Sequence, residues 1–182
     1  MSETADRYRE RAVAFTEKVE GVPDDRWEAQ SPCEDWTARD VVRHMVSVSG
    51  MFLGFVGRDP PPAPSVDDDP KTAWSVTRDA LQAALEDPKV AQQEYDGMFG
   101  KTTFEKSVGQ FVCADLVVHN WDLSRATGQD DSLDPQWVKA LHTQLEPMDA
   151  QMRGPNAFGP KVEPPAGADD QTRLLCFLGR QP

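Results

Sequence analysis

Cysteine and histidine are scarce in this chain, which has three of each among 182 residues. The cysteines, Cys33, Cys113 and Cys176, are odd in number, far apart and without a C-x-x-C pair. This pattern argues against a disulfide framework and against an all-cysteine zinc site. We therefore expect reduced thiols and a cytoplasmic protein.

Positive charge is also in short supply. The chain has 19 Lys and Arg against 31 Asp and Glu, a formal net charge of −12, and no cluster of basic residues. Nucleic acids and anionic membrane surfaces are bound by clustered Lys and Arg. The sequence therefore argues against both as partners.

Long apolar runs are absent as well. No stretch approaches the roughly 18 apolar residues needed to cross a bilayer, and the first ten residues are charged, without the apolar centre of a signal peptide. We expect no membrane partner and a small-molecule substrate, and the sequence leaves a homodimer open. With 38% hydrophobic residues, the chain can bury one core, so we expect a single domain over residues 1–182.

Apolar residues recur at helical spacing along most of the chain. Capping and stop signals predict helices over about 3–20, from Thr37 to before Gly57, from Pro70 to before Pro88, over about 104–127, from Pro135 through a kink at Pro147 to Gly154-Pro155, and over 173–178. Residues 59–69 are rich in proline and acid, which predicts an extended or disordered linker. Residues 93–104 alternate and contain two glycines, which favours a short hairpin or an irregular loop. The expected fold is all-α: a four-helix bundle core with additional short helices and a small β-hairpin before the fourth helix.

The fourth helix carries ionisable residues on its predicted inner face. On a helical wheel one stripe contains Val108, Phe111, Val112, Asp115, His119, Asp122 and Ala126. Burying such groups costs several kcal/mol each unless they are paired or bind a metal. Asp115 and His119 are four residues apart, so both can reach a single ion.

The second helix supplies a third candidate ligand. His44 shares a predicted inward stripe with Val41, Val48, Met51 and Phe55. His44, Asp115 and His119 with an open fourth position have the arrangement of a catalytic metal site, which suits Zn²⁺, Ni²⁺ or Fe²⁺ almost equally. We expect a divalent cofactor, with zinc or nickel favoured. The alternative is a buried hydrogen-bond network of the same three residues without an ion.

Four further residues near these ligands have open roles. Asp122 lies one turn beyond His119, which favours a hydrogen bond to an imidazole N–H over direct metal ligation. Cys33 precedes a helix N-terminus, where a thiolate is favoured, although a small buried cysteine is the commoner case. Trp36 and Trp121 are expected to be packing residues or walls of the site.

Two motifs together resemble a known family. They read Pro32-Cys33-x-x-Trp36-Thr37-x-x-Asp40-x-x-x-His44 and Asp115-x-x-x-His119-x-Trp121-Asp122-Leu123-x-x-Ala126-x-Gly128, and the chain closes with Leu174-Leu175-x-x-Leu178-Gly179-Arg180. This pattern resembles the DinB/YfiT-like metal-binding superfamily, in particular its actinobacterial branch related to the N-terminal domain of mycothiol-dependent maleylpyruvate isomerase. The isomerase has Glu where this chain has Asp115.

The resemblance implies a four-helix bundle that holds a divalent metal through His44, Asp115 and His119. It also implies a metal-dependent transferase or isomerase that acts on small electrophiles with a low-molecular-weight thiol such as mycothiol. Two other functions stay open: a non-catalytic metal- or ligand-binding bundle, and a metal-dependent hydrolase that activates water.

Overall fold

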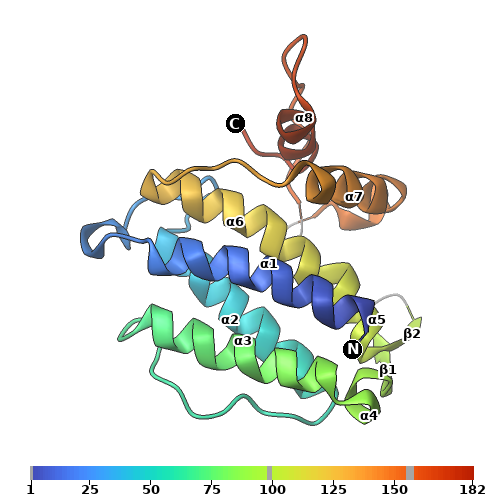
Figure 1. The fold of residues 1–182 in the computed structure, drawn as a ribbon. Helices are drawn as coiled ribbons and strands as arrows, with labels where there is room; N and C mark the ends of the chain where they lie inside the picture. Colours follow the sequence, from blue (N-terminus) through green and yellow to red (C-terminus); the bar gives the residue numbers. More distant parts are fainter. Residues whose placement is uncertain (1, 98–99, 155–157) are drawn as a thin grey trace.

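The computed structural model describes residues 2–97, 100–154 and 158–182 and is mostly helical (Figure 1). Its main helices are α1 (Glu3–Glu20), α2 (Ala38–Phe55), α3 (Pro70–Glu86), α6 (Cys113–Thr127), α7 (Pro135–Leu145) and α8 (Asp170–Phe177). Shorter elements are η1 (Asp24–Arg26), α4 (Pro88–Ala91), β1 (Glu94–Gly97), β2 (Gly100–Thr103), α5 (Phe104–Ser107), η2 (Val108–Val112) and η3 (Glu146–Met152).

Four of the helices form the bundle. α1 packs on α3 and α6, and α2 packs on the same two helices, so each helix has two neighbours around one core. Figure 1 shows α7 and α8 on the side of α6 away from α2 and α3. A second apolar cluster joins α6 to α7 and α8. The all-α prediction with a four-helix core is confirmed.

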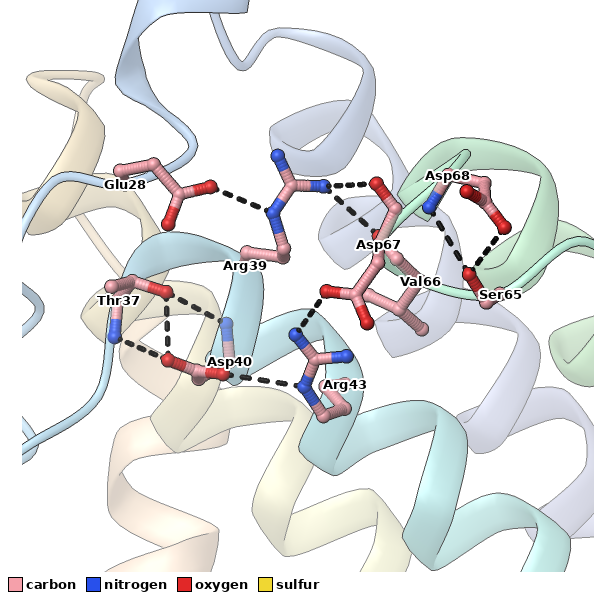
Figure 2. Close-up of polar contacts among 9 residues, drawn as sticks. All are labelled: Glu28, Thr37, Arg39, Asp40, Arg43, Ser65, Val66, Asp67 and Asp68. Atoms are coloured by element: carbon pink, nitrogen blue, oxygen red, sulfur yellow. Dashed lines mark hydrogen bonds and ion pairs between the residues drawn. The ribbon is translucent and has the colours of Figure 1, made fainter.

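Local capping signals define where the helices begin. Thr37 and Asp40 exchange side-chain and backbone hydrogen bonds in a capping box at the start of α2 (Figure 2). Asp69 caps α3, with Pro70 in its first turn. Gly128 ends α6 in the left-handed conformation, with a φ of 74°. These boundaries agree with the sequence prediction.

The predicted β-hairpin is present before the fourth bundle helix. β1 and β2 pair antiparallel from Glu94 opposite Thr103 to Gly97 opposite Gly100. Met98 and Phe99, which lie between the strands, are outside the described residues.

The fourth helix is less regular than its sequence suggests. We expected one helix over 104–127, whereas α5 is followed by a π-helical stretch, η2, before α6 begins. A π-helical turn contains more residues than an α-helical turn, so the wheel loses its phase across Val108–Val112. The predicted stripe is nevertheless buried at Val108, Val112, His119, Asp122 and Ala126, and only Phe111 and Asp115 are partly exposed.

α6 is also buried on nearly all sides. Asp115 is half-buried, and Arg125 is exposed. Of the 15 residues of α6, the other 13 are buried. The reason is that α6 faces α1 and α2 on one side and α7 and α8 on the other. Asp115 faces His44 of α2, but its side chain is 28% exposed, so it lies at the edge of the core rather than inside it.

The predicted stripe of α2 is similarly displaced. Its buried residues are Ala38, Val41, Val42, Met45, Ser49, Phe52 and Leu53. His44 lies at the border of this face, whereas Met51 and Phe55 are 50% and 44% exposed. His44 therefore stands at the edge of the core rather than inside it.

Two C-terminal boundaries differ from the prediction. α7 ends at Leu145, and the chain continues as the 3-10 stretch η3, because Pro147 lacks the N–H that an α-helix would use. The predicted stop at Gly154-Pro155 falls partly on Pro155, which is outside the described residues. α8 begins earlier than predicted, because Asp169 caps it through the Thr172 N–H.

The proline-rich linker is anchored at its end. Val66 is buried in the bundle core, and Arg43 of α2 forms an ion pair with Asp67 at 2.9 Å. Arg39 donates to the carbonyl oxygens of Val66 and Asp67, as Figure 2 shows. The expectation of an extended or disordered segment is therefore wrong for these residues. Among the helices described, none combines the length and apolarity needed to cross a membrane.

Candidate metal centre

The structure brings His44, Asp115 and His119 together between α2 and α6. One donor atom from each lies within 4.8 Å of the others. His44 Nε2 and Asp115 Oδ2 are 3.4 Å apart, which is long for a hydrogen bond. Tetrahedral zinc with bonds of about 2.0–2.2 Å would place neighbouring ligand atoms about 3.4 Å apart. The donor set and its spacing therefore fit a divalent metal.

The three side chains differ in burial. Those of His44 and Asp115 are 27% and 28% exposed, whereas that of His119 is 8% exposed. Trp36 covers both imidazoles, with ring centroids 4.9 Å from His44 and 5.8 Å from His119. The centre is thus walled on one side by an indole and reachable from solvent beside His44 and Asp115.

Asp122 orients His119. Its Oδ2 lies 2.9 Å from His119 Nδ1, and its side chain is fully buried. Arg180 donates to the same carboxylate from Nη2 at 2.8 Å and from Nε at 3.3 Å. Asp122 therefore accepts from both His119 and Arg180, and it contacts the candidate ligand His119 at Nδ1, which leaves the other ring nitrogen free.

These partners determine the charge of Asp122. Burial alone raises the pKa of the carboxyl, but the hydrogen bond to His119 and the guanidinium of Arg180 outweigh it and bring the pKa to about 2. An ionised Asp122 can only accept, so Nδ1 of His119 is the donor. This leaves Nε2 of His119 as the nitrogen with a lone pair for an ion.

Cys33 belongs to the same network. Its thiol donates to Asp122 at 3.4 Å, and Arg180 Nη2 lies 3.4 Å from the sulfur. Burial, reinforced by the charge of Asp122, raises the pKa of the Cys33 thiol to about 12. Cys33 is therefore a neutral thiol at neutral pH. Desolvation and the nearby carboxylate of Asp122 outweigh the stabilisation of a thiolate by the N-terminus of α2.

The loop before α2 positions Cys33 and Trp36. Gln30 Nε2 donates to the carbonyl oxygens of Ser31, Cys33 and Trp36, and Ser31 N–H donates to Trp36 at 2.8 Å. A single glutamine side chain thus satisfies several loop carbonyls and holds both residues against the centre.

Arg180 is the residue whose role the sequence did not reveal. It lies 58 residues from Asp122, and only the tertiary structure brings it there. Gly179 enables this approach: its φ is 84°, and a Cβ would lie 2.9 Å from the Pro160 carbonyl oxygen. In the sequence, the Gly179-Arg180 pair of the closing motif was the feature from which a role for Arg180 could have been predicted.

A second donor group shares His119. Cys33, His119 and Asp122 also have donor atoms within 4.8 Å of one another. This group fits a metal poorly, because Arg180 already places a positive charge on Asp122 and beside the Cys33 sulfur. Its geometry is that of a hydrogen-bond network.

The remaining sequence candidates lie elsewhere. Trp121 is buried in the apolar cluster between α6, α7 and α8, so it packs rather than forming a wall of the centre. His142 lies against Phe177, with ring centroids 5.2 Å apart.

Comparison with known proteins identifies relatives of this chain. Two uncharacterized proteins of Mycobacterium tuberculosis, from strains CDC 1551 / Oshkosh and ATCC 25618 / H37Rv, are each 26% identical to it over 169 residues, which is 92% of this chain and 92% of each relative. No solved structure gives a significant match. Residues 8–124 match the family described as the mycothiol maleylpyruvate isomerase N-terminal domain. This segment contains α2, most of α6 and all three candidate ligands, so the chain belongs to that metal-binding, mycothiol-related family.

Proposed function

We propose that the protein is a divalent-metal-dependent transferase or isomerase that uses a low-molecular-weight thiol of the mycothiol type on small electrophiles. The observation that carries this proposal is the His44, Asp115 and His119 set, with His119 oriented by a buried Asp122–Arg180 pair. Zinc or nickel suits two imidazoles and a carboxylate.

The residues of the chain have separate tasks in this proposal. His44, Asp115 and His119 would hold the metal, and Asp122 keeps the proton of His119 on Nδ1. Trp36 excludes water from the imidazole side, whereas the partial exposure of His44 and Asp115 admits the two substrates. When bound, the metal supplies a thiolate at neutral pH, because a coordinated thiol loses its proton.

The reaction balances without an oxidant or a reductant. The cosubstrate thiol releases its proton to solvent, and its sulfur forms a bond to the electrophilic carbon. In a transferase reaction a leaving group departs with the electron pair of its bond to that carbon. In an isomerase reaction the π bond of the substrate opens as the carbon–sulfur bond forms, and its electron pair moves onto a conjugated oxygen. After rotation about the resulting single bond, that pair re-forms the π bond, the carbon–sulfur bond breaks, and the released sulfur takes up a proton from solvent.

The proposal is tested by cobalt substitution followed by addition of mycothiol. We expect the visible spectrum of the cobalt protein to change through a sulfur–metal bond, and to change equally in Cys33→Ser, which shows that the sulfur comes from the added thiol. A hydrolase that activates water should not respond to the thiol. Less than about half an equivalent of any transition metal in protein purified without a chelator, with no rise in melting temperature on adding one, would contradict the metal centre itself.

A further inference from the structure

A second polar pocket lies between α1 and the start of α7, and it shares no residue with the metal centre. It is a depression open to solvent with a volume of about 560 Å³, and it is lined by Glu3, Asp6, Arg7, Glu10, Arg11, Asp134, Gln136, Trp137 and Ala140. Figure 1 shows α1 and α7 on either side of the N-terminal end of α6. A volume of this size is in the range of small-molecule sites.

Arg11 is the most unusual residue of this pocket. It is only 5% exposed, yet it forms no ion pair with a carboxylate among the residues that the structure describes. Its Nη1 donates to the Cys113 carbonyl oxygen at 2.8 Å, whereas its buried Nε has no hydrogen-bond partner. Burial accordingly lowers the pKa of Arg11. A buried guanidinium without an anion is costly, so its retention calls for a ligand.

Arg7 repeats the pattern one helical turn earlier. Its Nε is also buried without a hydrogen-bond partner among the described residues, and its Nη2 donates to Thr4 Oγ1 at 3.5 Å. Gly109 leaves room for this guanidinium, because a Cβ at that position would lie 2.6 Å from Arg7 Nη2. The absence of a side chain at Gly109 therefore allows a second cation to lie beside the pocket.

The pocket also contains carboxylates that are not paired. Glu3, Glu10 and Asp134 form no ion pair within the part of the chain that the structure describes, and Asp6 pairs with Arg9, which is outside the lining. The pocket is therefore lined by both guanidinium groups and carboxylates, and these groups do not form ion pairs with each other. This arrangement is suited to a ligand that carries both signs.

We infer that the pocket binds a small zwitterion of the amino-acid type. Its carboxylate would lie on Arg7 and Arg11, its ammonium group on Glu10 and the neighbouring acids, and its apolar side chain against Trp137. Trp137 already stacks on Arg11, with the guanidinium carbon 5.8 Å from the ring centroid. The bidentate fork of arginine matches a carboxylate.

The experiment compares three related probes: L-leucine; N-acetyl-L-leucine, in which an amide replaces the ammonium group; and L-leucinamide, in which an amide replaces the carboxylate. Binding is measured by titration calorimetry and by melting temperature, with and without added zinc. We expect saturable binding of L-leucine and at least ten-fold weaker binding of each single-charge analogue.

Variants assign that binding to the pocket. Arg7→Gln and Arg11→Met should each weaken L-leucine binding at least ten-fold, whereas Lys18→Gln removes the same charge from α1 outside the pocket and should bind as the parent does. Because Arg7 is partly exposed, Arg7→Gln decides the question if Arg11→Met does not fold. Absence of saturable binding, equal binding of either analogue, or full binding by Arg7→Gln would overturn the inference.

Discussion

At the scale of single residues, the three proposed ligands should behave differently from Asp122. His44→Ala, Asp115→Ala and His119→Ala should each abolish tight metal binding, because each removes one of three donors. Asp122→Asn should cost about 10–100-fold in affinity, because Asp122 acts through His119 Nδ1. Metal titration monitored by competition with a chelating dye measures both effects. Equal losses for all four variants would make Asp122 a direct ligand.

His119→Leu separates a metal site from a structural network. In the metal-free protein, Leu keeps apolar volume, and Asp122 retains the hydrogen bonds from Arg180 at 2.8 and 3.3 Å. We therefore expect metal-free His119→Leu to melt no lower than the metal-free parent. Under the network alternative the lost partner would cost about 1–3 kcal/mol, and calorimetry without metal would show a clear drop.

Arg180→Met should be the most damaging change in this region. It leaves the fully buried carboxylate of Asp122 without its cation, which costs about 3–5 kcal/mol. Urea unfolding of the metal-free protein measures this loss. The double variant Arg180→Met with Asp122→Asn should recover part of it, because the stranded charge is gone, and a double variant no more stable than Arg180→Met would contradict the ion-pair explanation.

At the scale of elements, the capping box of α2 is the local device that starts the helix carrying His44. Thr37→Ala removes the acceptor for the Asp40 N–H and the donor to the Asp40 carboxylate, both visible in Figure 2. We expect a loss of about 1 kcal/mol in the free energy of unfolding. Thr37→Ser, which keeps the hydroxyl, should lose less in the same urea titration. Equal losses in both variants would show that the methyl group, not the hydroxyl, matters.

α6 shows where helical periodicity misleads. The expectation of a continuous helix over 104–127 was sound in composition, but η2 interrupts it. No local residue pattern predicts the π-helical stretch. The close approach of Arg7 to Gly109 within it joins residues far apart in the sequence. The starts of α2 and α3 and the end of α6, by contrast, depend on neighbours in sequence and were predicted well, whereas the end of α7 and the start of α8 were not.

At the scale of the whole molecule, α6 connects two apolar clusters. It contributes Cys113, Leu116 and Leu123 to the cluster with α1, α2 and α3, and other residues to the cluster with α7 and α8. We therefore propose that residues 1–182 unfold as one unit. Far-ultraviolet circular dichroism and tryptophan fluorescence should give the same urea midpoint. Two separated transitions would show that α7 and α8 form an independent unit.

Much of this protein was determined by local sequence alone. Caps such as Thr37 and Asp69 and the stop at Gly128 act within a few residues, so the all-α bundle could be predicted from them. The four-residue spacing of Asp115 and His119 likewise follows from helix geometry, which places both on one face.

Only the tertiary structure decided how exposed the ligands are and what surrounds them. Burial depends on every element packed around a helix, so Asp115 proved half-buried although the wheel placed it inside. The ion pair between Arg180 and Asp122 joins residues 58 positions apart. Helical periodicity cannot predict such a contact, because the contact depends on how the chain folds back toward α6 after α8.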